Sequence, residues 1–362
     1  MFTTAELLDA DATEAVERLG IDDPAAAALE VVGYPLGSPA TAALYRVRGP
    51  RGSLFCKVLQ HVRHWPGLQF MPPHLVDDFV EQLPWRAELA LWEPRVLATL
   101  PDGLRAPTLH ALVEMPGHRA AVWMEDVAEC PTPWDLERYR RAAFLLGRWN
   151  ARSTDPGLLA RCAHTGSNYA LRMYAENAVA HRGLLPLADD GLWSHPWLVG
   201  HGDLRAALLS LAEEIPSMLD RMDSFVLCSP HGDASPQNLL VPADAPDSFV
   251  AIDISFCAPH ALGFDLGQLL VGLVHAGVMP AARVPEIAAA ILPAYVEGLH
   301  AEGVHGQDAA ARDAFATGVM LRSGFDGLLL ELLEEAAEDR RAAFDERIEL
   351  ARALVELYRS TR

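Results

Sequence analysis

Two runs of sequence, Ser229-Pro-His-Gly-Asp-Ala-Ser-Pro-Gln-Asn-Leu-Leu-Val241 and Phe249-Val-Ala-Ile-Asp-Ile254, decide the fold of this chain. Both carry apolar, strand-forming residues around a few polar ones. The segment between them, Pro242-Ala-Asp-Ala-Pro-Asp-Ser248, has the composition of a turn. We therefore expect the two runs to pair as an antiparallel hairpin.

The position of the turn decides which polar side chains meet across this hairpin. If the turn centres between Ala245 and Pro246, Asn238 lies opposite Asp253, and directly opposed residues are about 5 Å apart. A carboxylate and an amide oxygen at that separation can share a hard cation such as Mg²⁺. A register shift of one residue would break this pairing, because it moves each side chain to the other face.

Another carboxylate, Asp233, precedes Asn238 in a loop that also contains His231, Gly232 and Pro236. This carboxylate can reach the same site without binding the metal. Phosphoryl transfer needs that arrangement: cations on the phosphates, and a separate carboxylate that orients the acceptor hydroxyl and takes its proton.

Lys57 is the only lysine of the chain, whereas all the other basic residues are arginines. It lies in the apolar, strand-like run Ser53-Leu-Phe-Cys-Lys-Val-Leu59. A compact ammonium fits a buried phosphate site that a planar guanidinium would overfill. We therefore predict that Lys57 holds the phosphates of a nucleotide. Glu88, in a helical pattern, is its expected ion-pair partner, with Glu93 as the second candidate.

Composition narrows the class of protein. The 362 residues are 51% hydrophobic and 22% charged, which is typical of a folded chain long enough for two lobes. The net charge of −20 argues against nucleic acid or an anionic membrane surface as partner; it would suit a cationic small molecule, and it serves solubility equally well. The five cysteines form no CxxC pair, and the N-terminal region is acidic where a signal peptide is basic, so we expect a cytoplasmic protein.

Hydrophobic periodicity predicts a small sheet followed by helices. We expect a helix over 3–19, strands over Glu30–Tyr34, Ala42–Val47 and Ser53–Leu59, a helix over 74–100, a strand over Ala120–Met124, a buried helix over Leu266–Ala282 and helix over 308–360. The small-residue loop 35–40 could lie over a phosphate, although such a signal is weak alone.

The segment Glu125-Asp126-Val127, followed by Pro131 and Pro133, has the composition of a hinge. The predicted fold class is therefore α+β with two lobes: a nucleotide-binding, antiparallel-sheet lobe over residues 1–125, and a mainly helical lobe over 126–362 with the catalytic loop, the metal site and acceptor-binding helices. Glu125 and Val127 are predicted to contact the nucleotide at the hinge.

The motif His231-Gly-Asp-x-x-x-x-Asn238, then Ile252-Asp253, then Gly263-Phe-Asp265-Leu-Gly, resembles the signature of the aminoglycoside phosphotransferase and choline kinase superfamily, whose fold is protein-kinase-like. The order of elements matches over residues 25–300. The resemblance implies that Asp233 is the catalytic base and that Asn238 and Asp253 bind Mg²⁺. It also implies that Asp265, together with His231, supports the catalytic loop. The implied activity is transfer of the γ-phosphoryl group of ATP to a small-molecule hydroxyl.

Departures from the protein-kinase pattern bear on the substrate. The chain has no G-x-G-x-x-G, no D-F-G and no A-P-E, so a protein acceptor is disfavoured. An antibiotic such as an aminoglycoside is the leading acceptor by resemblance, with sugar, choline-like or amino-alcohol metabolites as alternatives. GTP stays open beside ATP, as do a nucleotide-binding pseudokinase, a two-metal phosphatase, and a monomer or a homodimer.

Some features favour a plain structural role. A second His-Gly-Asp at 201–203 lacks the asparagine five residues on, and predicts only a loop or helix start. His61, His64 and His74 lack the spacing of a zinc site. Acidic residues that are candidates to face a cationic acceptor, but that more simply form a solvated face, are Asp189, Asp190, Glu331, Glu334, Glu335 and Glu338.

Overall fold

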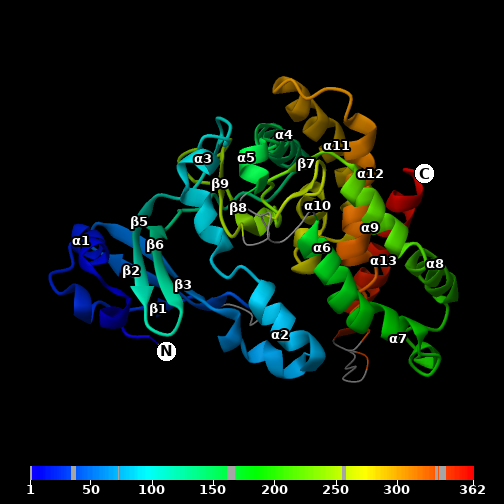
Figure 1. The fold of residues 1–362 in the computed structure, drawn as a ribbon, viewed down its shortest axis with the longest axis horizontal. Coiled ribbons are helices and arrows are strands. Elements are labelled where there is room, and N and C mark those ends of the chain that lie inside the picture. Colours follow the sequence, from blue (N-terminus) through cyan, green and yellow to red (C-terminus); the bar gives the residue numbers. More distant parts are fainter. Residues whose placement is uncertain are drawn as a thin grey trace.

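The computed structural model describes residues 2–33, 38–71, 73–160, 168–254, 258–330, 333 and 340–362. Residues 35–37 of the 35–40 loop and the acidic residues Glu331, Glu334, Glu335 and Glu338 lie outside the described residues. The chain forms a smaller lobe around a sheet and a larger lobe made mainly of helices (Figure 1). The prediction of a two-lobed α+β fold is confirmed.

The smaller lobe is built on a five-stranded antiparallel sheet with strand order β1-β2-β3-β6-β5. Its strands are β1 (Glu30–Val31), β2 (Thr41–Gly49), β3 (Gly52–Gln60), β5 (Leu109–Met115) and β6 (Arg119–Glu125). Successive side chains of β3 point to opposite faces of the sheet. Cys56 and Val58 pack with Trp123 in the core beneath the N-terminal helix, whereas Leu59 packs on the opposite face. Strand β5 did not figure among the sequence predictions.

Two predicted helices are interrupted. Residues 3–19 form a short 3₁₀ helix, η1 (Thr4–Leu7), which begins with a Thr3–Glu6 capping box, and then α1 (Ala10–Arg18), because Asp9 caps a new helix by accepting a hydrogen bond from the backbone of Ala12. Residues 74–100 divide into α2 (Pro73–Gln82), η5 (Ala87–Trp92) and α3 (Pro94–Leu97). Pro84 and Pro94 break the run, since proline disfavours helical geometry in the residue before it.

The larger lobe packs its helices around one core. Its helices are α4 (Leu136–Arg152), α5 (Pro156–Leu159), α6 (Tyr169–Tyr174), α7 (Leu185–Ala188), α8 (Gly202–Ala212), α9 (Ile215–Ser224), α10 (Leu266–His275), α11 (Val284–Ala301), α12 (Asp308–Val319) and α13 (Arg341–Arg359). Helices α4 and α11 approach closely at Gly147 and Gly298. A Cβ added at Gly147 would lie 2.2 Å from the backbone oxygen of Tyr295, so only glycine permits this contact.

The predicted helix over 308–360 is also interrupted. Its described parts are α12, a π-helical segment η11 (Met320–Gly324) and α13. A second π-helical segment, η7 (Ala175–Leu184), follows α6. The predicted buried helix over Leu266–Ala282 is α10, which ends at His275. None of the helices in the described ranges combines the length and the apolar character needed to cross a membrane.

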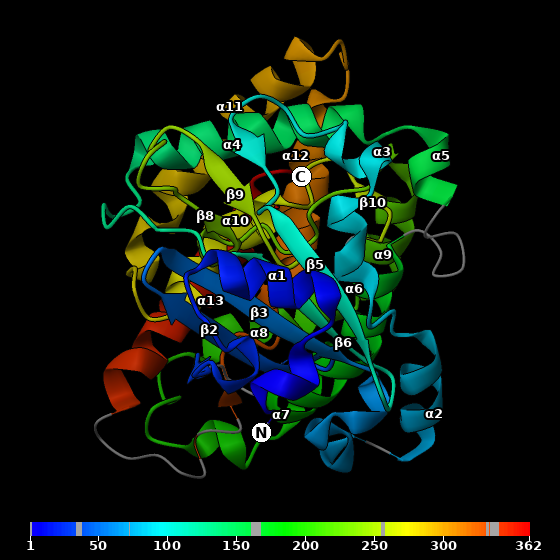
Figure 2. The same cartoon turned by 90° about the vertical axis from the view of Figure 1, so that its left-hand side faces the viewer.

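A small three-stranded sheet lies between the lobes (Figures 1 and 2). Strand β9 (Phe249–Ala251) pairs antiparallel with β8 (Leu239–Leu240) and parallel with β4 (Leu104–Arg105). Another short pair joins β7 (Leu227–Cys228) to β10 (His260–Ala261). The loop that follows β7 and the end of β9 carry the polar residues of the candidate site.

Candidate active site

Lys57 lies in the middle of β3 and points between the lobes. Its Nζ is 2.6 Å from Oε2 of Glu88 on η5 and 3.1 Å from Oδ1 of Asp253. The side chains of Lys57 and Glu88 are only 8% and 5% exposed, so this is a buried ion pair. Glu93, the second candidate partner, is exposed at the start of α3.

The electrostatics of this cluster keep Lys57 charged. Burial by itself would lower the pKa of Lys57, but the carboxylates of Glu88 and Asp253 outweigh burial and raise that pKa well above its usual value. The cluster holds two carboxylates around one ammonium. It therefore has capacity for a second cation next to Asp253, whose side chain is 30% exposed.

Residues 231–238, the predicted catalytic loop, are held by Asp265 at the start of α10. This carboxylate is 1% exposed and accepts hydrogen bonds from the backbone nitrogens of His231 (3.1 Å) and Gly232 (2.8 Å). His231 Nδ1 in turn accepts from the backbone nitrogen of Asp233 at 3.2 Å, and the His231 ring packs edge-on against Trp149. The loop therefore takes its shape from buried groups, before any substrate is bound.

Sequence analysis missed a second layer behind Asp265. Asn150 on α4 donates to Asp265 Oδ2 at 3.0 Å, and its own oxygen accepts from the hydroxyl of Tyr295 on α11 at 2.8 Å. That hydroxyl also accepts from the backbone nitrogen of Gly263 at 2.8 Å. An asparagine on the apolar face of an amphipathic helix, near the helix C-terminus, was the available signal, because an amide that becomes buried needs partners.

Asp233 and Asn238 face each other across the loop. The amide nitrogen of Asn238 donates to Asp233 Oδ2 at 3.0 Å and to the Asp233 backbone oxygen at 2.9 Å. The other carboxylate oxygen, Oδ1, accepts from Nη2 of Arg322 at 2.8 Å. Arg322, on η11, is a further residue that sequence analysis did not identify.

The predicted hairpin register is wrong by one residue. The structure pairs Leu239 with Ala251, and Ile252 donates its backbone hydrogen to Asn238 at 3.0 Å, so Asn238 lies opposite Ile252 and not Asp253. Asp253 nevertheless reaches Lys57, because the strand ends at Ala251 and Asp253 adopts a left-handed conformation (φ 57°) that turns its side chain. The prediction that Asn238 lies opposite Asp253 assumed that the strand stays extended up to Asp253, whereas the strand ends at Ala251.

The donor atoms fit Mg²⁺. Because the Asn238 nitrogen is committed to Asp233, the amide presents its oxygen, and Asp253 supplies a carboxylate beside Lys57. Both are hard oxygen ligands, and Mg²⁺ in kinase sites is usually held by one or two carboxylates with phosphate and water oxygens. The described residues contain no group of three or more His, Cys, Asp or Glu side chains that could hold a metal.

Side-chain hydrogen bonds and ion pairs hold the connection between the lobes in place. Glu125 is bound through both carboxylate oxygens by Arg105, at 2.7 Å each, and this arginine lowers the pKa of Glu125. Asp126 accepts from Arg46 at 2.8 Å and from Ser53. The side chain of Glu125 is therefore occupied, and a nucleotide contact in this segment would have to use backbone groups such as those of Val127.

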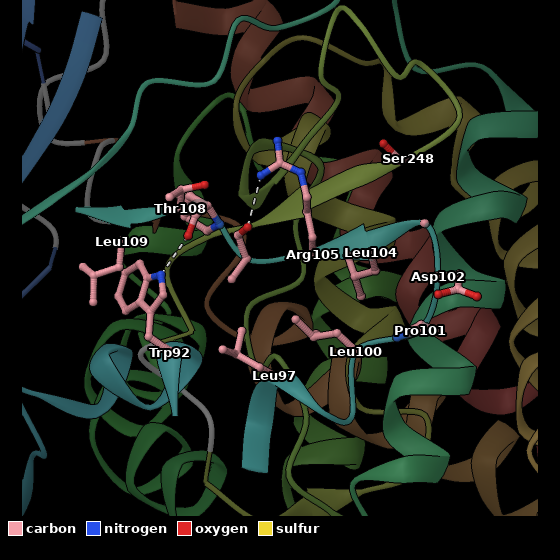
Figure 3. A pocket seen from close by; sticks show the side chains of 13 residues that line it. Trp92, Leu97, Leu100, Pro101, Asp102, Leu104, Arg105, Thr108, Leu109 and Ser248 are labelled. Atoms are coloured by element: carbon pink, nitrogen blue, oxygen red, sulfur yellow. Dashed lines mark hydrogen bonds between the residues drawn. The ribbon is translucent and has the colours of Figure 1, made fainter. Parts of the chain in front are cut away.

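A cavity of about 690 Å³ lies behind this connection and not at the catalytic loop (Figure 3). Trp92, Leu97, Leu100 and Leu109 form its apolar side, and Arg105 crosses it. Lys57, Asp233, Asn238 and Asp253 are all absent from its lining. The cavity is thus separate from the candidate active site.

Other acidic residues singled out in the sequence have local partners. Asp203 of the second His-Gly-Asp forms a bidentate ion pair with Arg352, with distances of 2.5 and 2.9 Å. This pair links α8 to α13. Asp189 accepts from the backbone of Gly191, and Asp190 pairs with Arg205. These two carboxylates are thus engaged in local structure.

Comparison with known proteins bears on the fold. No protein-family model matches the chain, and no curated protein matches it. Among solved structures, spectinomycin phosphotransferase in complex with ADP and spectinomycin aligns over 96% of this chain and 97% of its own, with 13% identity and a TM-score of 0.53.

Two other kinases give similar values. The microcompartment-associated aminopropanol kinase aligns over 97% of this chain and 98% of its own, with 17% identity and a TM-score of 0.51. An amicoumacin kinase in complex with AMP-PNP and Ca²⁺ aligns over 92% and 88%, with 14% identity and a TM-score of 0.51. The fold is therefore that of the aminoglycoside phosphotransferases and related small-molecule kinases, as the motif predicted.

Proposed function

We propose that this protein is an ATP- and Mg²⁺-dependent phosphotransferase that moves the γ-phosphoryl group to a hydroxyl of a small molecule. One observation carries the proposal: a continuous chain of contacts joins the buried Lys57–Glu88 pair to Asp233. Lys57 contacts Asp253, the residue before Asp253 bonds to Asn238, and Asn238 bonds to Asp233. The site thus combines a lysine to bind the nucleotide phosphates, two oxygen ligands for Mg²⁺ and a carboxylate to act as base, on a fold shared with small-molecule kinases.

Each residue then has a defined part. Lys57 binds the nucleotide phosphates, and Glu88 orients its ammonium. Asn238 and Asp253 are the residues that would hold Mg²⁺, which when bound neutralises charge on the phosphates. Asp233 accepts the proton of the acceptor hydroxyl as that oxygen bonds to the γ-phosphorus, and the bond from the γ-phosphorus to the bridging oxygen breaks to release ADP.

The nucleotide would lie between the lobes, with its base against the connection at Val127. We place the border of the lobes at residues 125 and 126. ATP is our first candidate and GTP the second. Within the described ranges, the backbone N–H of Val127 has no hydrogen-bond acceptor, and such a group is suited to reading the edge of a base.

For the acceptor, we propose a hydroxylated antibiotic, with an aminoglycoside as the first candidate. Spectinomycin phosphotransferase and amicoumacin kinase, which have this fold, are named for antibiotic substrates. An amino alcohol or related metabolite is the second candidate, since aminopropanol kinase has the same fold. A pseudokinase is less well supported, because the base and both candidate metal ligands are present.

The test is an ATP-consumption screen with Mg²⁺ across aminoglycosides, other hydroxylated antibiotics, sugars and amino alcohols. Asp233→Asn is the blank, because it removes the base at constant shape. Asp247→Asn, an exposed carboxylate in the turn after β8, is the matched control. Turnover with one acceptor that Asp233→Asn loses and Asp247→Asn keeps would support the proposal. Nucleotide binding without turnover would favour the pseudokinase, and no nucleotide binding would refute both.

A further inference from the structure

A contact at Asp233 goes beyond the residues that the motif contains. Arg322 reaches the catalytic loop from η11, far downstream in the sequence. Its Nη1 donates to the backbone oxygen of Gly232 at 2.6 Å and its Nη2 to Asp233 Oδ1 at 2.8 Å. The guanidinium thereby holds two consecutive residues of the loop at once. Arg322 is 13% exposed and lies 5.9 Å from the ring of Phe264.

We propose that Arg322 is a positioning residue for phosphoryl transfer, which fixes the carboxylate of Asp233 so that Oδ2 receives the proton of the acceptor. This inference rests on the proposed function. It assigns to η11 a part in the reaction, in addition to the site formed by the catalytic loop and β9.

The hydrogen bonds of the carboxylate decide which oxygen takes the proton. Oδ1 accepts from a cationic donor, Arg322, whereas Oδ2 accepts from the neutral amide of Asn238. The charged guanidinium therefore occupies Oδ1 with a strong, directional hydrogen bond and fixes the plane of the carboxylate, and Oδ2 is the oxygen that can turn to the acceptor hydroxyl. Each carboxylate oxygen can accept two hydrogen bonds, so Oδ2 can still accept from the acceptor hydroxyl.

The segment that carries Arg322 is anchored on its other side. Asp326, which is 7% exposed, accepts from the hydroxyl of Tyr174 at 2.8 Å and from Arg182 at 2.9 Å. These partners lie at the end of α6 and on the π-helix η7. The η11 region is therefore held between the catalytic loop and η7, and both η7 and η11 are π-helical, a geometry often found at functional sites.

Arg322 acts through Asp233 and transfers no proton itself. The acceptor oxygen bonds to the γ-phosphorus, its proton moves to Asp233 Oδ2, and ADP leaves. Arginine stays protonated throughout, because its guanidinium does not lose a proton in proteins. Its planar fork suits the two oxygens of Gly232 and Asp233, and lysine can supply the charge but not the fork.

The experiment is a kinetic double-mutant cycle in the full-length protein, with ATP and the acceptor found in the screen. We expect Arg322→Gln to lower kcat by about 10- to 100-fold with KM for ATP changed less than about 3-fold, and Arg322→Lys to restore part of the loss. Arg312→Gln, an exposed arginine on α12, is the matched control and should leave kcat unchanged. In Asp233→Asn protein, Arg322→Gln should cause no further loss, because its effect passes through the carboxylate.

The outcomes separate the two proposals. Wild-type turnover with an unchanged kcat in Arg322→Gln would overturn the role of Arg322 and leave the proposed function intact. Equal losses from Arg322→Gln in wild-type and Asp233→Asn protein would also overturn it, because they would show a structural effect independent of the base. Wild-type protein that binds nucleotide but transfers phosphate to no hydroxyl would refute the proposed function and this inference with it.

Discussion

The most direct test of how the catalytic loop is held is the substitution Asp265→Asn. The carboxylate accepts three hydrogen bonds: Oδ1 from Gly232 N, and Oδ2 from His231 N and from Asn150. An asparagine keeps the shape but has one acceptor oxygen. In the better of its two orientations, the asparagine oxygen faces His231 and Asn150. The NH₂ group of the asparagine then faces the backbone N–H of Gly232, so two donors meet where the native side chain is only 1% exposed.

The expected cost follows from those contacts. A hydrogen bond to a charged group contributes about 1.5–3 kcal/mol, and an unsatisfied buried donor costs about 1–3 kcal/mol. The two values cannot simply be added, because both count part of the same lost hydrogen bond. We therefore expect Asp265→Asn to lower the free energy of unfolding by about 2–4 kcal/mol, a large share of the 5–15 kcal/mol that is usual for a folded protein. We also expect kcat to fall more than nucleotide affinity, since the loop carries the base whereas Lys57 lies on β3.

The measurement is urea unfolding at neutral pH, with nucleotide titration and turnover on the same samples. Asp308→Asn is the control: this carboxylate accepts a hydrogen bond from His300 at 2.9 Å but is 54% exposed, so its loss should cost less than about 1 kcal/mol. If Asp265→Asn unfolds within about 0.5 kcal/mol of the wild type, the loop is held by other contacts and the reasoning is refuted.

Three further predictions concern other parts of the molecule. Lys57→Met should abolish nucleotide binding in a titration and destabilise the fold by about 3 kcal/mol in urea unfolding, because it leaves the buried carboxylate of Glu88 without a cation; unchanged affinity would contradict the assignment. Burial lowers the pKa of His260 from 6.5 to about 3, so the unfolded chain takes up a proton that the folded protein does not. The stabilisation from neutral His260 is complete above about pH 6.5 and is lost as the pH falls toward 3, by about 1.4 kcal/mol per pH unit. His260→Asn should therefore flatten the acid limb of stability against pH, measured by denaturant unfolding from pH 7 to 4, while the exposed His74→Asn should not; equal slopes would argue against the buried neutral ring. Gly147→Ala should force α4 from Tyr295 on α11 and lower the thermal midpoint by several degrees in calorimetry, whereas an unchanged midpoint would show that the two helices separate at little cost.

Local sequence was enough to predict the fold and to single out most residues of the candidate site. The His-Gly-Asp-x-x-x-x-Asn run predicts its own loop, because a short segment with fixed spacing encodes both the proposed base and the amide that faces it. Lys57 was identifiable by its isolation among arginines and its apolar strand, since an ammonium buried in a sheet needs a partner. The order of sheet, hinge and helices followed from hydrophobic periodicity, although Pro84, Pro94 and the Asp9 cap divided two predicted helices.

The tertiary structure decided what depends on contacts between distant parts of the chain. The hairpin register depends on where one turn closes, and a shift of one residue exchanges the faces of a strand, so composition alone placed Asn238 opposite the wrong residue. Arg322 and Asn150 carry no motif, because their partners lie about 90 and 115 residues away. Sequence by itself therefore determined the fold and most of the polar residues of the candidate site. Only the folded chain determined which atoms hold the carboxylate of Asp233, since that depends on helices that are adjacent in space and remote in sequence.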